Sequence, residues 1–248
     1  MPSVAGIYAI TPFSLLDYPG EMACVVWLAT CNLRCVYCHN PDIVRGPGKL
    51  GDKDLADLLN SRRGLLTGVV LSGGEPTFNR KLASYAATAK GLGFKVKLDT
   101  NGTNPAVVRD LIDRKLIDAV ALDYKCPPAI AQRVLNTAAF TEAFQETLAY
   151  LIEAHRDGKV HLEIRTTFHT DFMDETDIAW IMEDLERRNY TGGYFLQNIV
   201  ATGDATLGNI PKPARALVPE RLPQPKNFTL GFRNFPTPPA KGPQNPES

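Results

Sequence analysis

Three cysteines lie within eight residues, at Cys31, Cys35 and Cys38, and they make up most of the five cysteines in the chain. Thiolates this close together suit a metal or an iron–sulfur cluster better than packing or a disulfide. A zinc site would need a fourth ligand, or a His or carboxylate arrangement that is not evident here. A cubane takes one cysteine per iron and normally four, so three would leave one iron open to a substrate. The cysteine count favours catalysis, and a non-catalytic iron–sulfur or zinc-binding module is the alternative.

Two motifs that follow predicted strands place polar side chains beside glycines. In the SGGEP segment at 72–76, Gly73 and Gly74 would let a ligand approach the backbone closely, and Glu75 could accept hydrogen bonds from an ammonium group. Taken alone, this segment is equally typical of a simple turn. The DTNG segment at 99–102 has the same two interpretations, because Asp, Asn and Gly are common turn formers.

Arg165 lies late in a predicted strand, where an unpaired buried guanidinium would be costly. Its partner is either a protein carboxylate such as Asp123 or the carboxylate of a ligand. Gln197 ends the last clear strand and could hydrogen-bond a ligand, although a surface glutamine fits the pattern better. All of these candidates fall at the carboxyl ends of predicted strands, where barrel and open α/β sites are built.

The elements that must position these residues alternate between strand and helix patterns. Apolar runs predict strands at 23–29, 68–72, 94–99, 119–123, 160–167 and 194–197. Amphipathic patterns predict helices between them, with N-termini set by Asp52, Asn79, Asn104 and Asp174. Six strands alternating with helices imply right-handed crossovers and a parallel α/β sheet, either open and doubly wound or a barrel.

The composition of the 248-residue chain is ordinary for a globular protein, with 44% apolar residues and enough length for one large domain. Lys and Arg balance Asp and Glu at 27 each, so no overall field favours nucleic acid or an anionic membrane. No apolar run approaches the roughly 18 residues of a spanning helix. The odd cysteine count fits a reducing compartment, so we expect a cytosolic protein. Cys24 and Cys126 have no assigned role.

The last part of the chain differs in composition. Ten of the 19 prolines follow residue 200, which argues against regular helices there. One short strand is predicted within 227–235. We therefore expect one domain over 1–235 and a flexible, Pro-rich tail over 236–248.

The cysteine spacing, with Tyr37 before the last cysteine and the HNP segment at 39–41 after it, resembles the radical S-adenosylmethionine (SAM) enzymes. Together with the DYPG segment at 17–20, it resembles more narrowly the activating enzymes of glycyl radical proteins, and among them the activating proteins of anaerobic ribonucleoside-triphosphate reductases. The resemblance covers roughly residues 5–200. One departure is Thr30, where relatives often place Gly.

This resemblance implies a partial barrel of six βα units, open on one side. It implies a 4Fe-4S cluster held by the three cysteines, with SAM chelating the open iron through its amine and carboxylate. The Gly73, Gly74 and Glu75 segment matches the site of the methionine amine. His39 flanks the site but is not expected to ligate the cluster, and the Tyr37 region is expected against the adenine, where an aromatic face can stack.

In the resembled enzymes, residues matching Asp99, Thr100 and Asp123 lie beside the SAM carboxylate, in some members through a monovalent cation. Lys125 could pair with that carboxylate as a point charge. Arg165 could bind the same carboxylate, and Gln197 the adenine or ribose.

The implied reaction is reductive cleavage of SAM to methionine and a 5′-deoxyadenosyl radical, which takes a hydrogen atom from a glycine of a partner enzyme. The expected partner is an anaerobic ribonucleotide reductase, and the expected electron donor is a flavodoxin or ferredoxin. The main alternative is a radical SAM enzyme acting on a small molecule, similar to 7-carboxy-7-deazaguanine synthase. The sequence holds no second group of cysteines for auxiliary clusters.

Overall fold

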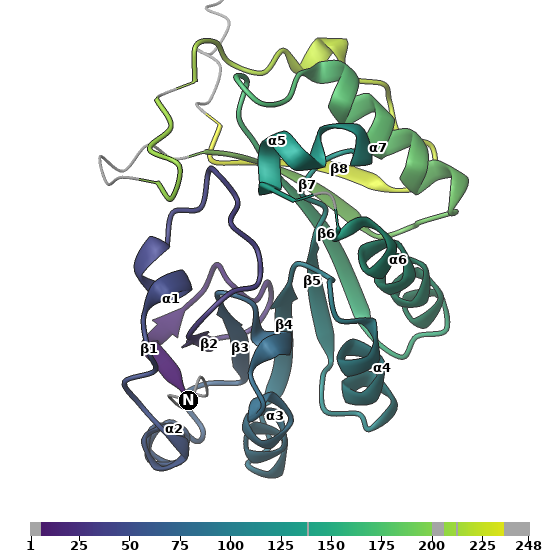
Figure 1. Ribbon diagram of the computed structural model, residues 1–248. Helices are drawn as coiled ribbons and strands as arrows, with labels where there is room; N and C mark the ends of the chain where they lie inside the picture. The colour runs from purple at the N-terminus through teal and green to yellow at the C-terminus, as the bar shows by residue number, and fades with distance from the viewer. Residues whose placement is uncertain (1–5, 138, 200–205, 212, 236–248) are drawn as a thin grey trace, which may run out of the picture.

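An eight-stranded sheet in sequential order β1 to β8 organises the computed structural model, which describes residues 6–137, 139–199, 206–211 and 213–235. β1 pairs antiparallel with β2, and all the other neighbouring strands pair parallel. The strands fan out into an open, curved sheet (Figure 1). They are β1 (Ile7–Ser14), β2 (Ala23–Leu28), β3 (Gly68–Gly73), β4 (Lys95–Thr100), β5 (Ala119–Asp123), β6 (His161–Phe168), β7 (Gly193–Asn198) and β8 (Thr229–Arg233).

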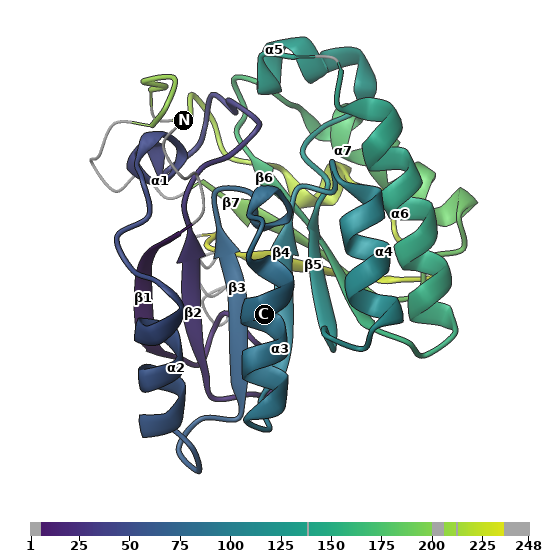
Figure 2. The same cartoon turned by 60° about the horizontal axis from the view of Figure 1, so that its bottom comes forward.

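Helices cover the convex side of this sheet, as Figures 1 and 2 show for α2, α3, α4, α6 and α7. The short helices α1 and α5 lie beyond the carboxyl ends of the strands (Figure 2). The α-helices are α1 (Pro41–Arg45), α2 (Asp52–Ser61), α3 (Leu82–Gly91), α4 (Pro105–Asp113), α5 (Ala131–Leu135), α6 (Thr141–Arg156) and α7 (Glu175–Arg187). Short 3-10 turns are η1 (Pro76–Phe78), η2 (Pro128–Ile130) and η3 (Pro219–Arg221).

The two faces of the sheet bury different side chains. Toward the helices, alternate strand residues such as Leu71, Leu98 and Val120 join the main apolar core, which excludes water from the crossovers. Toward the inside of the curve, a second and smaller apolar cluster contains Tyr18 and Val70. The two clusters pack against both faces of the sheet, so the carboxyl ends of the strands hold the loops that follow them in fixed positions.

The predicted fold class is confirmed, because the six predicted strands are present as β2 to β7 in one parallel sheet that does not close. The architecture is a partial barrel of the TIM type. The short strand predicted within 227–235 is present as β8, which extends the parallel sheet beyond the six expected units.

One predicted N-cap, Asp52, and one predicted helix start, Asn79, were wrong. Asp52 is the first residue of α2, and Gly51 is the N-cap, with its N–H donating to Asp54. Asn79 does not open α3, because its carboxamide oxygen accepts the N–H of Lys81 in a local turn and the helix begins after it. Asn104 and Asp174 are N-caps as predicted.

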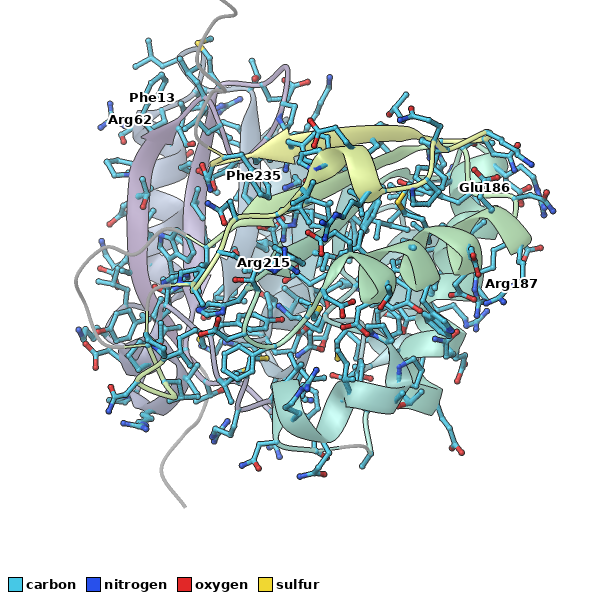
Figure 3. The ribbon with its side chains drawn as sticks, turned by 90° about the horizontal axis from the view of Figure 1, so that it is seen from above. Phe13, Arg62, Glu186, Arg187, Arg215 and Phe235 are labelled. Atoms are coloured by element: carbon cyan, nitrogen blue, oxygen red, sulfur yellow. The ribbon has the colours of Figure 1, made fainter. Side chains whose placement is uncertain are left out.

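The predicted Pro-rich tail, residues 236–248, lies outside the described residues. Within the described part of the chain, no helix combines the length and the apolar character needed to cross a bilayer. On the body of the molecule, Phe13 of β1 and Arg62 after α2 lie on the opposite side from Glu186 and Arg187 of α7 (Figure 3).

Candidate active site

A cavity of about 210 Å³ opens at the carboxyl ends of β2 to β6. It gathers almost all of the residues predicted from the sequence, although they come from the cysteine loop and from the ends of four further strands, β3 to β6. Predicted residues that line it are Cys31, Cys35, Tyr37, Cys38, His39, Gly73, Gly74, Glu75, Asp99, Thr100, Asp123, Lys125 and Arg165. Trp27, Ser72 and Asn101 also line it. Gln197, which is half-buried at the end of β7, is not among the lining residues.

The cysteine loop leaves β2 through a strained residue. Thr30 has a φ of 73°, a left-handed conformation that costs a β-branched residue about 1–2 kcal/mol. The backbone of Thr30 is held on both sides, since its N–H donates to the carbonyl of Ile43 at 2.8 Å and its carbonyl accepts the N–H of Glu75 at 2.9 Å. These bonds offset the strain and fix the direction in which Cys31 leaves the strand.

Asn32 ties this loop to the loop after β4, a link that sequence reasoning missed. Its amide donates to Thr103 Oγ1 at 2.9 Å, and its carbonyl oxygen accepts from the amide of Asn101 at 3.0 Å. Thr103 in turn donates to Asn101 Oδ1. The resulting triangle joins residues 71 positions apart, and no local pattern could have revealed it.

The other end of the cysteine loop is held by a C-terminal segment. The N–H groups of Leu207 and Gly208 donate to the carbonyls of Cys38 and Val36, at 3.0 and 2.9 Å. Gly208 is required there, because a Cβ atom would lie 2.8 Å from the Val36 carbonyl oxygen.

The same segment is anchored by Arg215, near the middle of the view in Figure 3, through two 2.6 Å contacts to Glu175. The hydrogen bond and charge of Arg215 lower the pKa of Glu175 to about 2. Chain beyond β7 therefore contributes to holding the cysteines in place.

The thiols lie in a desolvated environment. Burial raises the pKa of Cys31 to about 12, and burial also raises the pKa of Cys35. Bound iron would have to supply the charge that makes them thiolates. Among the described residues, no group of three or more His, Cys, Asp or Glu side chains converges on a point where one metal ion could bind. A 4Fe-4S cluster takes one cysteine per iron, so Cys31, Cys35 and Cys38 could hold three irons and leave the fourth open.

Glu75 is buried and already accepts four hydrogen bonds. Its Oε1 accepts from the N–H and hydroxyl of Thr77 and from the hydroxyl of Thr100. Among the described residues, Oε2 accepts only the N–H of Asn101, at 2.7 Å. Burial raises the pKa of Glu75, although these donors oppose the shift. Oε2 retains capacity for a further donor, which suits an ammonium or amine group in the cavity.

The two glycines before Glu75 are required by close backbone contacts. Gly73 has a φ of +125°, a conformation that side chains rarely adopt, and a Cβ on Gly74 would lie 1.8 Å from the carbonyl oxygen of Thr30. The glycine pair therefore lets the loop after β3 lie directly against the cysteine loop.

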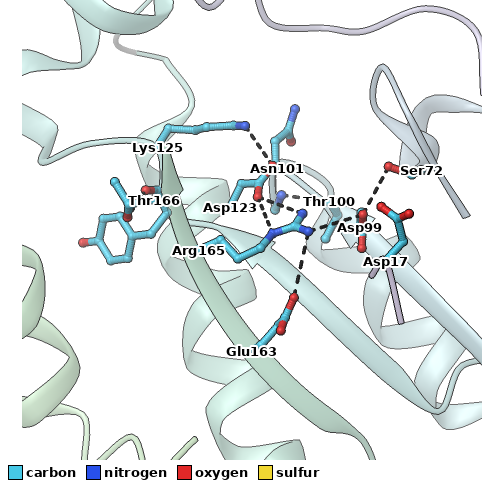
Figure 4. A network of polar contacts seen from close by, with 12 residues as sticks. Asp17, Ser72, Asp99, Thr100, Asn101, Asp123, Lys125, Glu163, Arg165 and Thr166 are labelled. Carbon is cyan, nitrogen blue, oxygen red and sulfur yellow. Dashed lines mark hydrogen bonds and ion pairs between the residues drawn. The ribbon is translucent and has the colours of Figure 1, made fainter. Parts of the chain in front are cut away.

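In the same cavity, Arg165 lies between two carboxylates, Asp99 and Asp123 (Figure 4). Its Nη2 is 2.9 Å from Asp123 Oδ1, and its Nη1 is 3.4 Å from Asp99 Oδ2. Lys125 lies 2.8 Å from the other oxygen of Asp123. The protein itself thus gives Arg165 its partners, the first of the two interpretations, and the cationic edges of Arg165 and Lys125 still line the cavity.

These contacts lower the pKa values of the two carboxylates and raise the pKa of Lys125. Burial raises the pKa of Asp123, but Arg165 and Lys125 outweigh it and hold the value at about 2. Burial also opposes ionisation of Asp99, yet Arg165 and Lys97 hold its pKa below the usual range. The pKa of Lys125 is raised because Asp123 outweighs the effect of burial. All of these groups are therefore charged at neutral pH.

Comparison with known proteins identifies this arrangement. The family model described as the radical SAM superfamily matches residues 25–180, more than half of the chain. The chain belongs to the radical SAM superfamily. A protein of Methanocaldococcus jannaschii that is provisionally named a glycyl-radical enzyme activating enzyme is 34% identical over 194 residues, covering 73% of this chain and 75% of the relative. A 7-carboxy-7-deazaguanine synthase of Hyperthermus butylicus is 35% identical over 96 residues, covering 38% and 40%.

Two solved structures share the fold. SuiB of Streptococcus suis, bound to S-adenosylmethionine, superposes with a TM-score of 0.56 at 16% identity over 74% of this chain and 41% of that one. The enzyme anSMEcpe with bound AdoMet gives a TM-score of 0.51 at 21% identity, over 69% and 49%. This chain therefore spans less than half the length of those two proteins.

Radical SAM enzymes use a 4Fe-4S cluster and SAM, and the residues that line the cavity suit both groups. One buried and two half-buried thiols share the cavity with the buried Glu75 and with partly buried carboxylates and cations, as a zwitterionic ligand next to a cluster would require. Tyr37 is 4% exposed, and its hydroxyl has no hydrogen-bond partner within the described ranges. A buried phenol without a partner in a cavity wall is a further sign that a ligand completes this site.

Proposed function

We propose that this protein is an activating enzyme of a glycyl radical enzyme. The observation that carries the proposal is the similarity to the M. jannaschii relative, which extends over about three quarters of both chains. A partial match to a Haemophilus influenzae protein with the same provisional name, 29% identical over 101 residues, adds support. When bound, the reduced cluster and SAM would supply a 5′-deoxyadenosyl radical, which takes a hydrogen atom from the partner's glycine.

The chain's own residues bind and orient the reactants. Cys31, Cys35 and Cys38 would each hold one iron, leaving one iron open, while Glu75 Oε2 would accept a hydrogen bond from the methionine amine. Lys125 and Arg165 would face the SAM carboxylate in the same cavity. No side chain is needed as a general acid or base, because the chemistry moves an electron and a hydrogen atom.

For the partner, we propose an anaerobic ribonucleotide reductase, with a flavodoxin or ferredoxin as electron donor. The test is electron paramagnetic resonance of the reconstituted protein mixed anaerobically with reductase, reductant and SAM. The doublet of a glycyl radical should appear, and it should be absent with a reductase whose target glycine is replaced by alanine. SAM turnover without this doublet would contradict the proposed partner.

A small-molecule substrate is the second candidate, because two 7-carboxy-7-deazaguanine synthases match parts of the chain at 31–35% identity. Those matches cover less than half of this chain, whereas the activating-enzyme match covers 73%. Analysis of the reaction products for 7-carboxy-7-deazaguanine would separate the two candidates, since only a synthase would form it.

A further inference from the structure

The inner face of the sheet carries a buried ionic cluster below the SAM cavity. Glu163 of β6 is 5% exposed and is surrounded by three cations. Its Oε1 lies 3.6 Å from Lys97 Nζ and 3.9 Å from Arg165 Nη1, and its Oε2 lies 2.9 Å from Arg233 Nη2. Figure 4 shows Glu163 reaching up to Arg165 from the side away from Asp123.

Two of these cations also contact the carboxylates that line the cavity. Lys97, which is 2% exposed, donates to Asp99 Oδ1 at 2.8 Å and to the carbonyl of Asp17 at 2.7 Å. Arg165 contacts Asp99 and Asp123. Glu163 is thus linked through a single cation to both Asp99 and Asp123, yet it does not line the cavity.

The fourth member, Arg233, comes from β8, the strand beyond the six βα units. Its guanidinium lies 3.8 Å above the ring of Phe195 on β7, which directs it toward Glu163. The ring of Phe195 fits only because Gly193 and Gly231 flank it, since a Cβ on either glycine would lie 2.6–2.7 Å from a ring atom. Three residues on two strands are therefore arranged to hold Arg233 against Glu163.

We propose that Glu163 and Arg233 are positioning residues for SAM. Glu163 holds Lys97 and Arg165 where they orient Asp99 and Asp123, and Arg233 balances the charge of Glu163 so that it does not draw Arg165 away from the cavity. Burying three cations around one carboxylate is stable only while the charges balance. The inference rests on the cavity binding SAM, and it is independent of the partner's identity.

The experiment measures the Kd of SAM by equilibrium dialysis on anaerobically reconstituted protein, together with iron and sulfide content. Glu163→Gln should raise the Kd about tenfold and Arg233→Gln about threefold, with cluster content unchanged. The double variant should bind within about twofold of Glu163→Gln, because Arg233 acts on the cavity only through Glu163 and its loss adds little once Glu163 is gone. Glu146→Gln and Arg114→Gln, whose side chains are 59% and 52% exposed, serve as controls and should bind like the wild type.

Three results would overturn the inference: SAM binding by Glu163→Gln within about twofold of the wild type, a double-variant loss equal to the product of the single losses, or losses that follow a parallel loss of iron. The last would show that the cluster of charges only supports the fold. A wild-type protein that holds iron but does not bind SAM would overturn the site assignment as well, which distinguishes the two failures.

Discussion

The two halves of the inner face of the sheet differ in chemistry. Below the cysteine loop, β2 and β3 present small apolar side chains such as Ala23, Val25 and Val70, and backbone hydrogen bonds hold the loop. From β4 to β8 the same face carries ion pairs centred on Arg165 and Glu163. We propose that each half suits one ligand: the apolar half would support the cluster, and the charged half would bind a zwitterion.

The largest expected effect is on the apolar half, where loss of a cysteine should abolish SAM cleavage without disturbing the charged half. Cys35→Ala removes one of three cluster ligands, so production of 5′-deoxyadenosine from SAM should fall below detection while the protein stays soluble, since the charged half is untouched. Chromatographic assay of deoxyadenosine under reducing, anaerobic conditions measures it. Cys24→Ala is the matched control, because Cys24 is buried in β2 but does not line the cavity. Deoxyadenosine formation by Cys35→Ala would refute the ligand assignment.

Breaking the charged half should cost stability instead. Asp123→Asn leaves Arg165 and Lys125 without the carboxylate that they share, which should lower the free energy of unfolding by about 3 kcal/mol. Urea denaturation of the iron-free protein measures this loss. Asp110→Asn, whose side chain is 54% exposed and pairs with Arg114, should change stability by less than about 0.5 kcal/mol. Equal losses in the two variants would remove the distinction between the buried network and the surface.

The pH dependence of stability tests the charged half in a second way. Because the folded pKa of Asp123, about 2, lies below its value in the unfolded chain, its ionisation stabilises the fold fully above about pH 5. That contribution, about 2 kcal/mol, should be lost as the pH falls toward 2. The stability difference between wild type and Asp123→Asn should therefore shrink between pH 5 and pH 3, as followed by urea unfolding. A difference independent of pH would show that the carboxylate is not held ionised by its neighbours.

Glu75 lies where the two halves meet, so its substitution tests their connection. Glu75→Gln replaces one carboxylate oxygen with an NH₂ group, which would face the N–H and hydroxyl donors of Thr77, Thr100 and Asn101. This donor-to-donor contact should lower the free energy of unfolding by about 1–3 kcal/mol. We expect SAM binding to weaken about tenfold while iron content changes little. Titration calorimetry and iron analysis measure the two quantities. Unchanged affinity would remove Glu75 from the amine site.

The smallest expected effect concerns Thr30 in the apolar half. Thr30→Gly relieves the left-handed backbone of a β-branched residue and should stabilise the fold by about 0.5–1 kcal/mol, less than the strain itself because glycine loses more entropy on folding. Asn136→Gly, at a φ of 58° that Asn tolerates well, should gain less. Thermal unfolding of both variants measures these changes in stability. Destabilisation by Thr30→Gly would show that the Thr30 side chain makes a favourable contact that outweighs the backbone strain.

Sequence patterns located one half of the site better than the other. The cysteines and the loop with Glu75 are local motifs, whose spacing can be read directly. Lys97 and Glu163 also lie on predicted strands, but a period of two does not tell which face turns inward, and only the curvature of the sheet buries them. Arg233 lies 70 residues from its partner Glu163, on the short strand predicted within 227–235, whose place in the sheet the sequence did not indicate. Long-range ion pairs of this kind have no local signal.

The most direct test of the central claim is electron paramagnetic resonance of the reduced, anaerobically reconstituted protein before and after SAM is added. If a three-cysteine cluster and the charged half share one ligand, SAM should change the cluster spectrum in the wild type, and the change should need a higher SAM concentration in Glu163→Gln than in Glu146→Gln. A spectrum that SAM leaves unaltered, or bound zinc in place of a cluster, would contradict the account.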